Sequence, residues 1–233
     1  MAMVENAAVN HLISSLPRAE RRRLLAQCET VKLVLGEVLF EAGEPIRHVY
    51  FPTDGFISLV ALLEGYPGLE VGMVGREGML GAQLALGVKT APLRALVQGA
   101  GQALRIGSRT FCIELARSAP MQRGQNRYLS LLMAQLAAST ACVRFHLIGP
   151  RLARWLLISQ DRAHADSFAI THQLLATMLG VRRVGVTVAA SALRRRGLID
   201  YHRGQLTVLN RKGLEAAACS CYASGRATYT ALL

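Results

Sequence analysis

The sequence lacks the patterns of a secreted or membrane protein. Its five cysteines are odd in number and mostly far apart, so they are not the framework of a disulfide-rich fold. Met1 to His11 shows no basic segment followed by an apolar core, so we expect no signal peptide. The longest uncharged stretch, Tyr128 to Val143, contains polar residues and falls short of the ~20 apolar residues that a membrane span needs. We therefore expect a soluble, cytoplasmic protein.

Patterns of enzymes are also missing. There is no G-x-x-x-x-G-K-[ST] phosphate loop and no G-x-S-x-G nucleophile elbow, and the six histidines do not have metal-ligand spacing. Cys219-x-Cys221 is the one close cysteine pair, and without a second pair we interpret it as structural rather than as half of a zinc site. No cysteine cluster for an iron–sulfur centre is present. We expect no catalytic residues, no metal and no enzymatic activity.

Acidic residues are scarce in the last third of the chain. From Gly149 onward there are twelve Lys and Arg against four Asp and Glu, whereas the longer first part has fifteen against eleven. The whole chain has a net charge of +12. A basic C-terminal region indicates a polyanionic partner such as nucleic acid or anionic lipid, although a generic basic surface would have the same composition.

Between Val31 and about Ile106, short apolar and β-branched runs alternate with glycine and proline. The runs are Val31–Leu35, Val38–Phe40, Val49–Phe51, Ile57–Leu63, Leu69–Val74 and Leu93–Val97. Short strands at regular turn spacing are typical of an antiparallel barrel or sandwich. Shorter helical patterns precede this region, between residues 12 and 28.

A long helical pattern then runs from Met121 to Leu147. Its apolar positions are spaced 3, 4, 3 and 4 apart, which is an a/d seam: Leu129, Leu132, Leu136, Ser139 and Val143. A helix of about 27 residues is about 40 Å long. Such a helix exceeds what a small domain needs for its own core, so we predict that it pairs with a second copy of the chain. Packing on its own chain is the alternative.

Thr171 to Leu193 has the pattern of a helix-turn-helix. Thr171 can cap a first helix whose apolar stripe contains Leu174, Leu175, Met178 and Leu179, and Gly180 suits its end. A second helix begins at about Arg182 and ends before Gly197. Two helices joined by a short turn containing glycine form the helix-turn-helix unit.

The second helix divides into two faces. Val186, Ala189, Ala190 and Leu193 recur at helical spacing and are predicted to pack inward. On the outer face, Arg183 can bond a guanine edge, and Val184 or Val188 can touch a thymine methyl. Arg194 to Arg196 suit phosphates, although an arginine triplet also occurs on solvated helix ends. The predicted DNA-binding residues are Thr171, His172, Gln173, Arg182, Arg183, Val184, Thr187, Val188, Ser191, Arg194, Arg195 and Arg203.

After this helix, Gly197 to Tyr201 leads into a strand, and His202-Arg203-Gly204 indicates a tight turn. Gln205 to Leu209 alternates as a return strand. A β-hairpin after the second helix is a wing, and Arg203 at its tip is placed to contact a phosphate.

The chain resembles the Crp/Fnr family of bacterial transcription regulators over nearly its whole length. The resemblance is strongest at residues 170–183, ITHQLLATMLGVRR, and from Leu193 to Ile199. Residues 36–44, GEVLFEAGE, resemble the family's cyclic-nucleotide-binding-like β-roll. The resemblance to the family implies an α+β fold with a jelly-roll-like antiparallel β-roll (1–117), a dimerisation helix (118–147) and a winged helix-turn-helix domain (148–233).

The sequence departs from members that bind cAMP. They carry an acid after a glycine and later an Arg-Ser or Arg-Thr pair, whereas Ala82 follows Gly81 here and Arg94 lies one place late. One place in a strand turns a side chain to the opposite face. We therefore expect that cAMP is not the ligand, and the sequence names no other effector or cofactor. The residues of the candidate effector pocket are Arg76, Glu77, Gly81, Ala82 and Arg94.

These patterns predict a homodimeric regulator that binds double-stranded DNA, with a β-roll that senses an effector or serves as a scaffold. Val184 and Val188 stand where several members carry Glu and Arg, so we expect a different DNA site. Contact with RNA polymerase follows only from family analogy. The alternative function is a cyclic-nucleotide-binding signalling module without DNA activity, and the basic winged helix argues against it.

Overall fold

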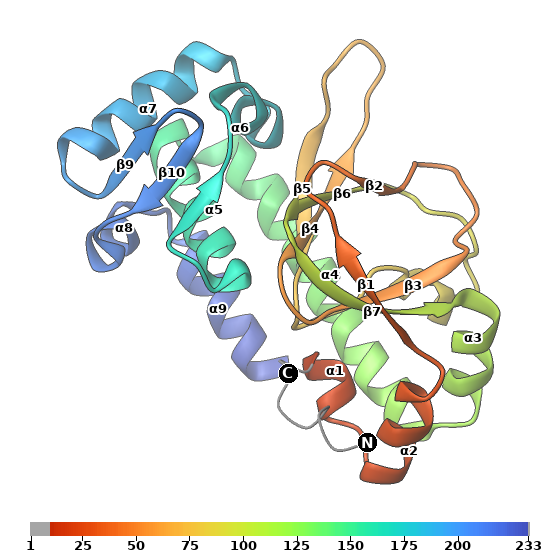
Figure 1. Ribbon diagram of the computed structural model, residues 1–233. Helices are drawn as coiled ribbons and strands as arrows, with labels where there is room; N and C mark the ends of the chain where they lie inside the picture. The colour runs from red at the N-terminus through yellow and green to blue at the C-terminus, as the bar shows by residue number, and fades with distance from the viewer. Residues whose placement is uncertain (1–9, 233) are drawn as a thin grey trace.

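The computed structural model describes residues 10–232 as two domains joined by a long helix (Figure 1). The sequence prediction about a signal peptide falls mainly on residues outside this range. Two short helices, α1 (His11–Ser14) and α2 (Arg18–Leu25), precede the strands. They lie in the region where the sequence has a helical pattern.

The N-terminal domain is a β-roll made of two antiparallel sheets. One sheet has the order β1-β7-β3 and the other the order β2-β6-β4-β5. The strands are β1 (Glu29–Leu33), β2 (Val38–Phe40), β3 (His48–Pro52), β4 (Phe56–Ala61), β5 (Leu69–Val74), β6 (Arg94–Gly99) and β7 (Gly101–Gly107). The 3₁₀ helix η1 (Ala82–Leu86) lies between β5 and β6. The predicted β-roll is confirmed, with β7 as an additional strand.

The roll buries alternate strand residues between its sheets. Ala95 and Val97 of β6 are fully buried in a core that also contains Ile57 of β4 and Phe51 of β3. Because strand side chains alternate between faces, the neighbours of Ala95 and Val97 belong to the other side of β6. On that side, Leu96 packs against the C-terminal domain.

Helix α3 (Ser108–Ala116) leads into α4 (Ala119–Phe145), which spans the molecule (Figure 1). Ser118 caps α4 by accepting a hydrogen bond from the backbone N–H of Met121. The first half of α4 packs on the β-roll through Tyr128 and Leu131, and the second half packs on α9 (Cys221–Leu232). A third face of α4 remains exposed.

Length and composition alone would allow α4 to cross a membrane, and only 22% of its most apolar window is buried. In the fold, however, the helix lies between the two domains and packs on strands and helices of both. The exposed face of α4 consists of apolar and small residues, so its composition is similar to that of a membrane-spanning helix.

The C-terminal domain is a helical bundle with a small sheet. It contains α5 (Ile148–Ala163), β8 (Ser167–Ala169), α6 (His172–Leu179), α7 (Arg183–Arg195), β9 (Ile199–His202), β10 (Gln205–Val208) and α8 (Arg211–Ala217). The sheet order is β8-β10-β9. The predicted hairpin is β9–β10, and β8 adds an edge strand to it in a segment that the sequence analysis did not recognise as a strand.

The two domains pack directly on each other. Phe56, Val60 and Met73 of the β-roll share an apolar core with α5 and α6. Trp155 of α5 donates a hydrogen bond to Glu70 of β5, with 3.0 Å between Nε1 and Oε1. The C-terminal domain is therefore held against one outer face of the β-roll.

Candidate DNA-binding surface

Helix α6 begins and ends as its sequence predicts. The Thr171 hydroxyl accepts a hydrogen bond from the backbone N–H of Leu174, which satisfies a donor that the helix itself leaves free. Gly180 ends the helix in the left-handed conformation, with φ of 62°. The chain can therefore turn sharply there into the next helix.

Helix α7 crosses α6 at 108°, within the range of helix-turn-helix units. Its inner face is buried as predicted, with Val186 fully inaccessible and Leu193 nearly so. Ala176 of α6 and Ala189 and Ala190 of α7 are also buried. Small side chains on both helices permit the close crossing, and the polar face of α7 is left outside.

The outer face of α7 presents the predicted DNA-binding residues to solvent. Val184 and Val188 are 67% and 64% exposed, which is unusual for valine. The methyl groups of both side chains are therefore accessible to a partner. Arg183 occupies the first turn of α7, and Arg182 precedes it. Ten of the twelve predicted residues are exposed and two, His172 and Ser191, are half-buried. The exposed ones are Thr171, Gln173, Arg182, Arg183, Val184, Thr187, Val188, Arg194, Arg195 and Arg203.

His172, in contrast, is held by its own chain. Its ring stacks on Tyr201 of β9 at 4.5 Å between centroids, and its Nδ1 lies 3.1 Å from the Thr187 hydroxyl. Burial lowers the pKa of His172, and the positive charge of Arg183 lowers it further, so the neutral ring is favoured. His172 thus joins α6, α7 and the wing.

The arginines at the end of α7 differ in their partners. Arg194 forms an exposed ion pair with Asp200, at 2.9 Å between Nε and Oδ1. Arg195 and Arg196 are exposed and form no ion pair in the part of the chain that the structure describes. Among the three, Arg195 and Arg196 are therefore the ones available to an external anion.

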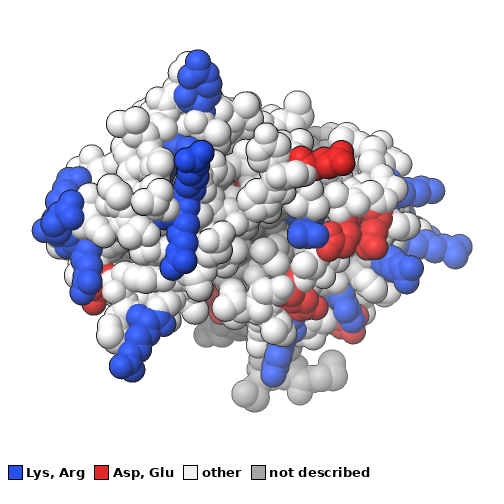
Figure 2. Space-filling view, turned by 90° about the horizontal axis from the view of Figure 1, so that it is seen from above, with Lys and Arg blue, Asp and Glu red and all other residues white. Residues whose placement is uncertain are grey.

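The wing has a two-residue turn in which Arg203 and Gly204 both have positive φ, 47° and 82°. Two consecutive left-handed residues match the twist of an antiparallel hairpin. Arg203 is exposed at the tip, as predicted. Residues 171–203 contain six arginines and one acid, Asp200. In Figure 2, blue side chains predominate on the left, over the C-terminal domain, whereas blue and red mix on the right.

The candidate effector residues do not converge on one pocket. Arg94 forms an ion pair with Glu41 at 2.9 Å, with both side chains more than a third exposed. Glu77 turns toward the C-terminal domain and pairs with the buried Arg162 of α5 at 3.0 Å. Gly81 has φ of 96° and starts η1, where Ala82 is buried. Arg94 is thus engaged with Glu41 at a partly exposed position.

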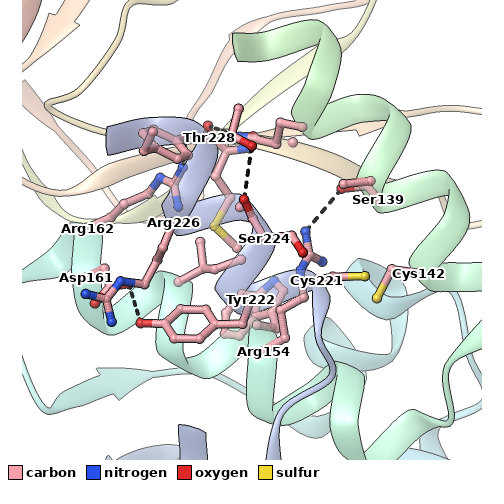
Figure 3. Close-up of a pocket in the computed structure, with 18 of the residues that line it drawn as sticks. Ser139, Cys142, Arg154, Asp161, Arg162, Cys221, Tyr222, Ser224, Arg226 and Thr228 are labelled. Atoms are coloured by element: carbon pink, nitrogen blue, oxygen red, sulfur yellow. Dashed lines mark hydrogen bonds between the residues drawn. The ribbon is translucent and has the colours of Figure 1, made fainter. Parts of the chain in front are cut away.

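A cavity of about 350 Å³ lies instead between α4, α5, α9 and β5 (Figure 3). Arg76 and Glu77 line it, together with residues of three helices such as Ser139, Asp161 and Tyr222. Sequence reasoning did not anticipate this cavity, because α9 closes it and α9 showed no distinctive motif.

The predicted dimer residues lie beside the exposed face of α4 rather than along its centre. Leu129 and Leu132 pack against the β-roll core, and Ser139 is buried. Leu136 is half-buried and Val143 is 37% exposed. The next residue after each predicted position is exposed: Ser130, Met133, Ala137, Thr140 and Arg144. One residue turns a helix by about 100°.

A helix-turn-helix with an arginine-rich outer face, followed by a wing, defines the class of this chain as a DNA-binding transcription regulator. More particularly, residues 150–217 match the family model of the Crp-like helix-turn-helix domain. This match covers the helix-turn-helix and wing of the C-terminal domain and does not extend to the β-roll. A search of curated proteins gave no significant match.

Solved structures show that the whole fold is shared. FixK2 from Bradyrhizobium japonicum has a TM-score of 0.69 at 16% identity, covering 83% of this chain and 98% of its own. A putative Crp/Fnr-family regulator from Eubacterium rectale has a TM-score of 0.68 at 16% identity, covering 89% and 97%. The c-di-GMP-responsive regulator CLP from Xanthomonas campestris has a TM-score of 0.65 at 18% identity, covering 82% and 99%.

Proposed function

We propose that the chain acts in the cytoplasm as a homodimer that binds a two-part DNA site, with one α7 in the major groove of each half-site. The exposed outer face of α7, framed by six arginines and supported by a buried face of small residues, is the observation that carries the proposal. The centres of the two half-sites would lie about one turn of the DNA helix apart. The domain limits in this proposal are 1–117 for the β-roll, 118–147 for the dimerisation helix and 148–233 for the DNA-binding domain.

The exposed residues have distinct roles in this proposal. Arg183 bonds a guanine edge, and Val184 and Val188 contact thymine methyl groups. Arg182, Arg195 and Arg203 contact phosphates, and so do Thr171 and Gln173 at the start of α6. Because His172 is engaged with Tyr201 and Thr187, its role is to position α7 against the wing.

Selection of bound DNA from a random pool identifies the site, and fluorescence anisotropy then measures the affinity. Arg183→Ala is expected to weaken specific binding by about 1–3 kcal/mol and to relax one base position. Arg109→Ala removes an exposed arginine of α3 and serves as the charge-matched control. Failure of the unchanged chain to bind any duplex at low ionic strength would contradict the proposal.

The dimer interface is proposed on the exposed face of α4, with Met133 and Ala137 at its centre and Leu136 and Val143 at its edge. Met133 is 70% exposed, and the neighbouring alanines allow a second helix to approach closely. Met133→Lys combined with Ala137→Lys should give monomers in sedimentation. Leu63→Lys is the control, because Leu63 is an equally exposed apolar residue of the β-roll. Persistent dimers would place the interface elsewhere.

For the β-roll, we propose that cAMP is not the effector. Arg94 pairs with Glu41, so its guanidinium is not directed at an anionic ligand inside the roll, and Glu77 is paired with Arg162. Calorimetric titration with cAMP and cGMP should show no binding. Tight binding would reverse this view and would favour the alternative function of a cyclic-nucleotide-binding module.

A further inference from the structure

Three cysteines and a histidine meet where α4, α5 and α9 come together. Cys142 lies in the last turn of α4 and His146 directly follows that helix, whereas Cys219 precedes α9 and Cys221 begins it. One potential ligand atom from each of the four residues lies within 4.8 Å of all the others. Cys142 and Cys219 are buried, and the other two residues are half-buried. In Figure 3 the sulfurs of Cys142 and Cys221 point toward each other between α4 and α9.

The spacing of these atoms fits a tetrahedral ion. With Zn–S of about 2.3 Å and Zn–N of about 2.0 Å, two ligands of one tetrahedral zinc lie roughly 3.5 to 3.8 Å apart. The Cys142 and Cys219 sulfurs are 3.5 Å apart, and the Cys221 sulfur is 3.6 Å from Nδ1 of His146. An iron–sulfur cluster would separate its ligands further, because several metal atoms lie between them. The geometry therefore favours a single ion.

The charges around the cluster provide an independent argument. Arg151 of α5 is only 6% exposed, and its hydrogen bond goes to the backbone carbonyl of Leu179 rather than to a carboxylate. Among the described residues, neither Arg151 nor Arg154 forms an ion pair. Arg154 donates one long hydrogen bond to the Ser139 hydroxyl, and its Nε is buried without a partner. A buried guanidinium needs a nearby anion. Three thiolates and a neutral imidazole around Zn²⁺ have a net charge of −1, which suits these two arginines.

We propose that Cys142, His146, Cys219 and Cys221 form a mononuclear Zn²⁺ site. Metal binding would release the thiol protons and place four bonds between α4 and the segment that leads into α9. The site contains His146, which together with Leu147 connects α4 to the C-terminal domain. A bound ion would therefore fix the position of that domain relative to α4. The proposal extends beyond DNA binding and does not depend on it.

The test uses the full-length, tag-free protein, stripped of metal under reducing, anaerobic conditions and titrated with Co²⁺ and then Zn²⁺. We expect one ion per chain, the visible absorption of tetrahedral Co²⁺ with thiolate charge-transfer bands, and displacement of Co²⁺ by Zn²⁺. Cys221→Ser should weaken metal binding at least tenfold and remove part of the thiolate absorption. His146→Cys should retain a tetrahedral spectrum. Cys112→Ser, at an exposed cysteine outside the cluster, is the matched control.

Substoichiometric binding, an octahedral Co²⁺ spectrum or an unchanged affinity in Cys221→Ser would overturn the proposal. So would a Cys142–Cys219 disulfide as the stable state of the protein isolated under reducing conditions. Circular dichroism of each variant shows whether it is folded. DNA binding is measured separately, so failure of the metal site and failure of the DNA-binding function give different results.

Discussion

The two domains use their charged residues differently. In the C-terminal domain, Arg182, Arg183 and Arg195 are exposed on one surface and are available to an external partner. In the β-roll, the charged residues that might have served a ligand are paired within the chain, Arg94 with Glu41 and Glu77 with Arg162. The comparison teaches that charged residues of one chain can face an external partner in one domain and pair with one another in the other domain. Here one domain presents its polar groups outward, whereas the other uses them to hold the molecule together.

The buried ion pair between the domains should give the largest effect. Arg162 and Glu77 are 8% and 13% exposed at their side chains, so Glu77→Gln leaves a buried guanidinium without its carboxylate. We expect a loss of about 3–5 kcal/mol in the free energy of unfolding, measured by urea denaturation. Glu29→Gln breaks the exposed pair with Arg105 and is the control. An equally small change in both variants would show that the pair does not hold the domains together.

Glu70 should make stability depend on pH. Burial raises the pKa of Glu70 from its ordinary value of 4.5 to about 7, even though Ser58 and Trp155 donate hydrogen bonds to it. Between these values the folded state binds a proton that the unfolded state releases, so stability falls as the pH rises. The change is on the order of 3 kcal/mol. Denaturation at pH 5 and pH 8 measures it, and Glu70→Gln should flatten the difference. Equal slopes in both proteins would contradict the assignment.

The N-terminal cap of α6 tests how much one residue of the DNA-binding surface contributes to the stability of the C-terminal domain. Because its hydroxyl caps α6, Thr171→Ala should lower the stability of the C-terminal domain by about 1 kcal/mol. Thr171→Ser retains the cap and should restore stability in thermal unfolding. If the alanine variant lost DNA affinity without any loss of stability, Thr171 would act through the DNA alone.

Arg94 should give the smallest effect. Its pair with Glu41 is exposed on both sides, so Arg94→Gln is expected to change the free energy of unfolding by less than about 1 kcal/mol. It should also leave DNA binding unchanged, with or without added cyclic nucleotides. A nucleotide response that depends on Arg94 would return this residue to the effector site and remove the contrast between the domains.

Local patterns predicted much of this fold. The strand limits at Val38–Phe40 and Leu69–Val74, the cap at Thr171 and the helix end at Gly180 all follow from residues adjacent in sequence. The strand β7 was not predicted, because the glycines around it indicated only a turn. The strand β8 is three residues long, and its pairing with β10 depends on contacts distant in sequence.

Tertiary contacts explain the remaining differences. Heptad spacing predicted a seam on α4, but it does not show which of two adjacent stripes of the helix the chain itself covers. The β-roll and α9 determine that. Likewise, the sequence analysis interpreted Cys219-x-Cys221 as structural, because no second pair of metal ligands lies near it in the sequence. Cys142 and His146 are four residues apart on α4, and only the fold brings them to the other two.

The connection between α4 and α5 has a mechanical consequence. His146 and Leu147 both have extended backbone conformations, and Leu147 is 80% exposed, so little packing resists rotation there. When the proposed Zn²⁺ site is empty, a small rotation at these two residues would change the position of α7 relative to the β-roll. Such a rotation would open the apolar core that Phe56, Val60 and Met73 share with α5 and α6. Its energetic cost is separating α5 and α6 from the outer face of β4, β5 and β6.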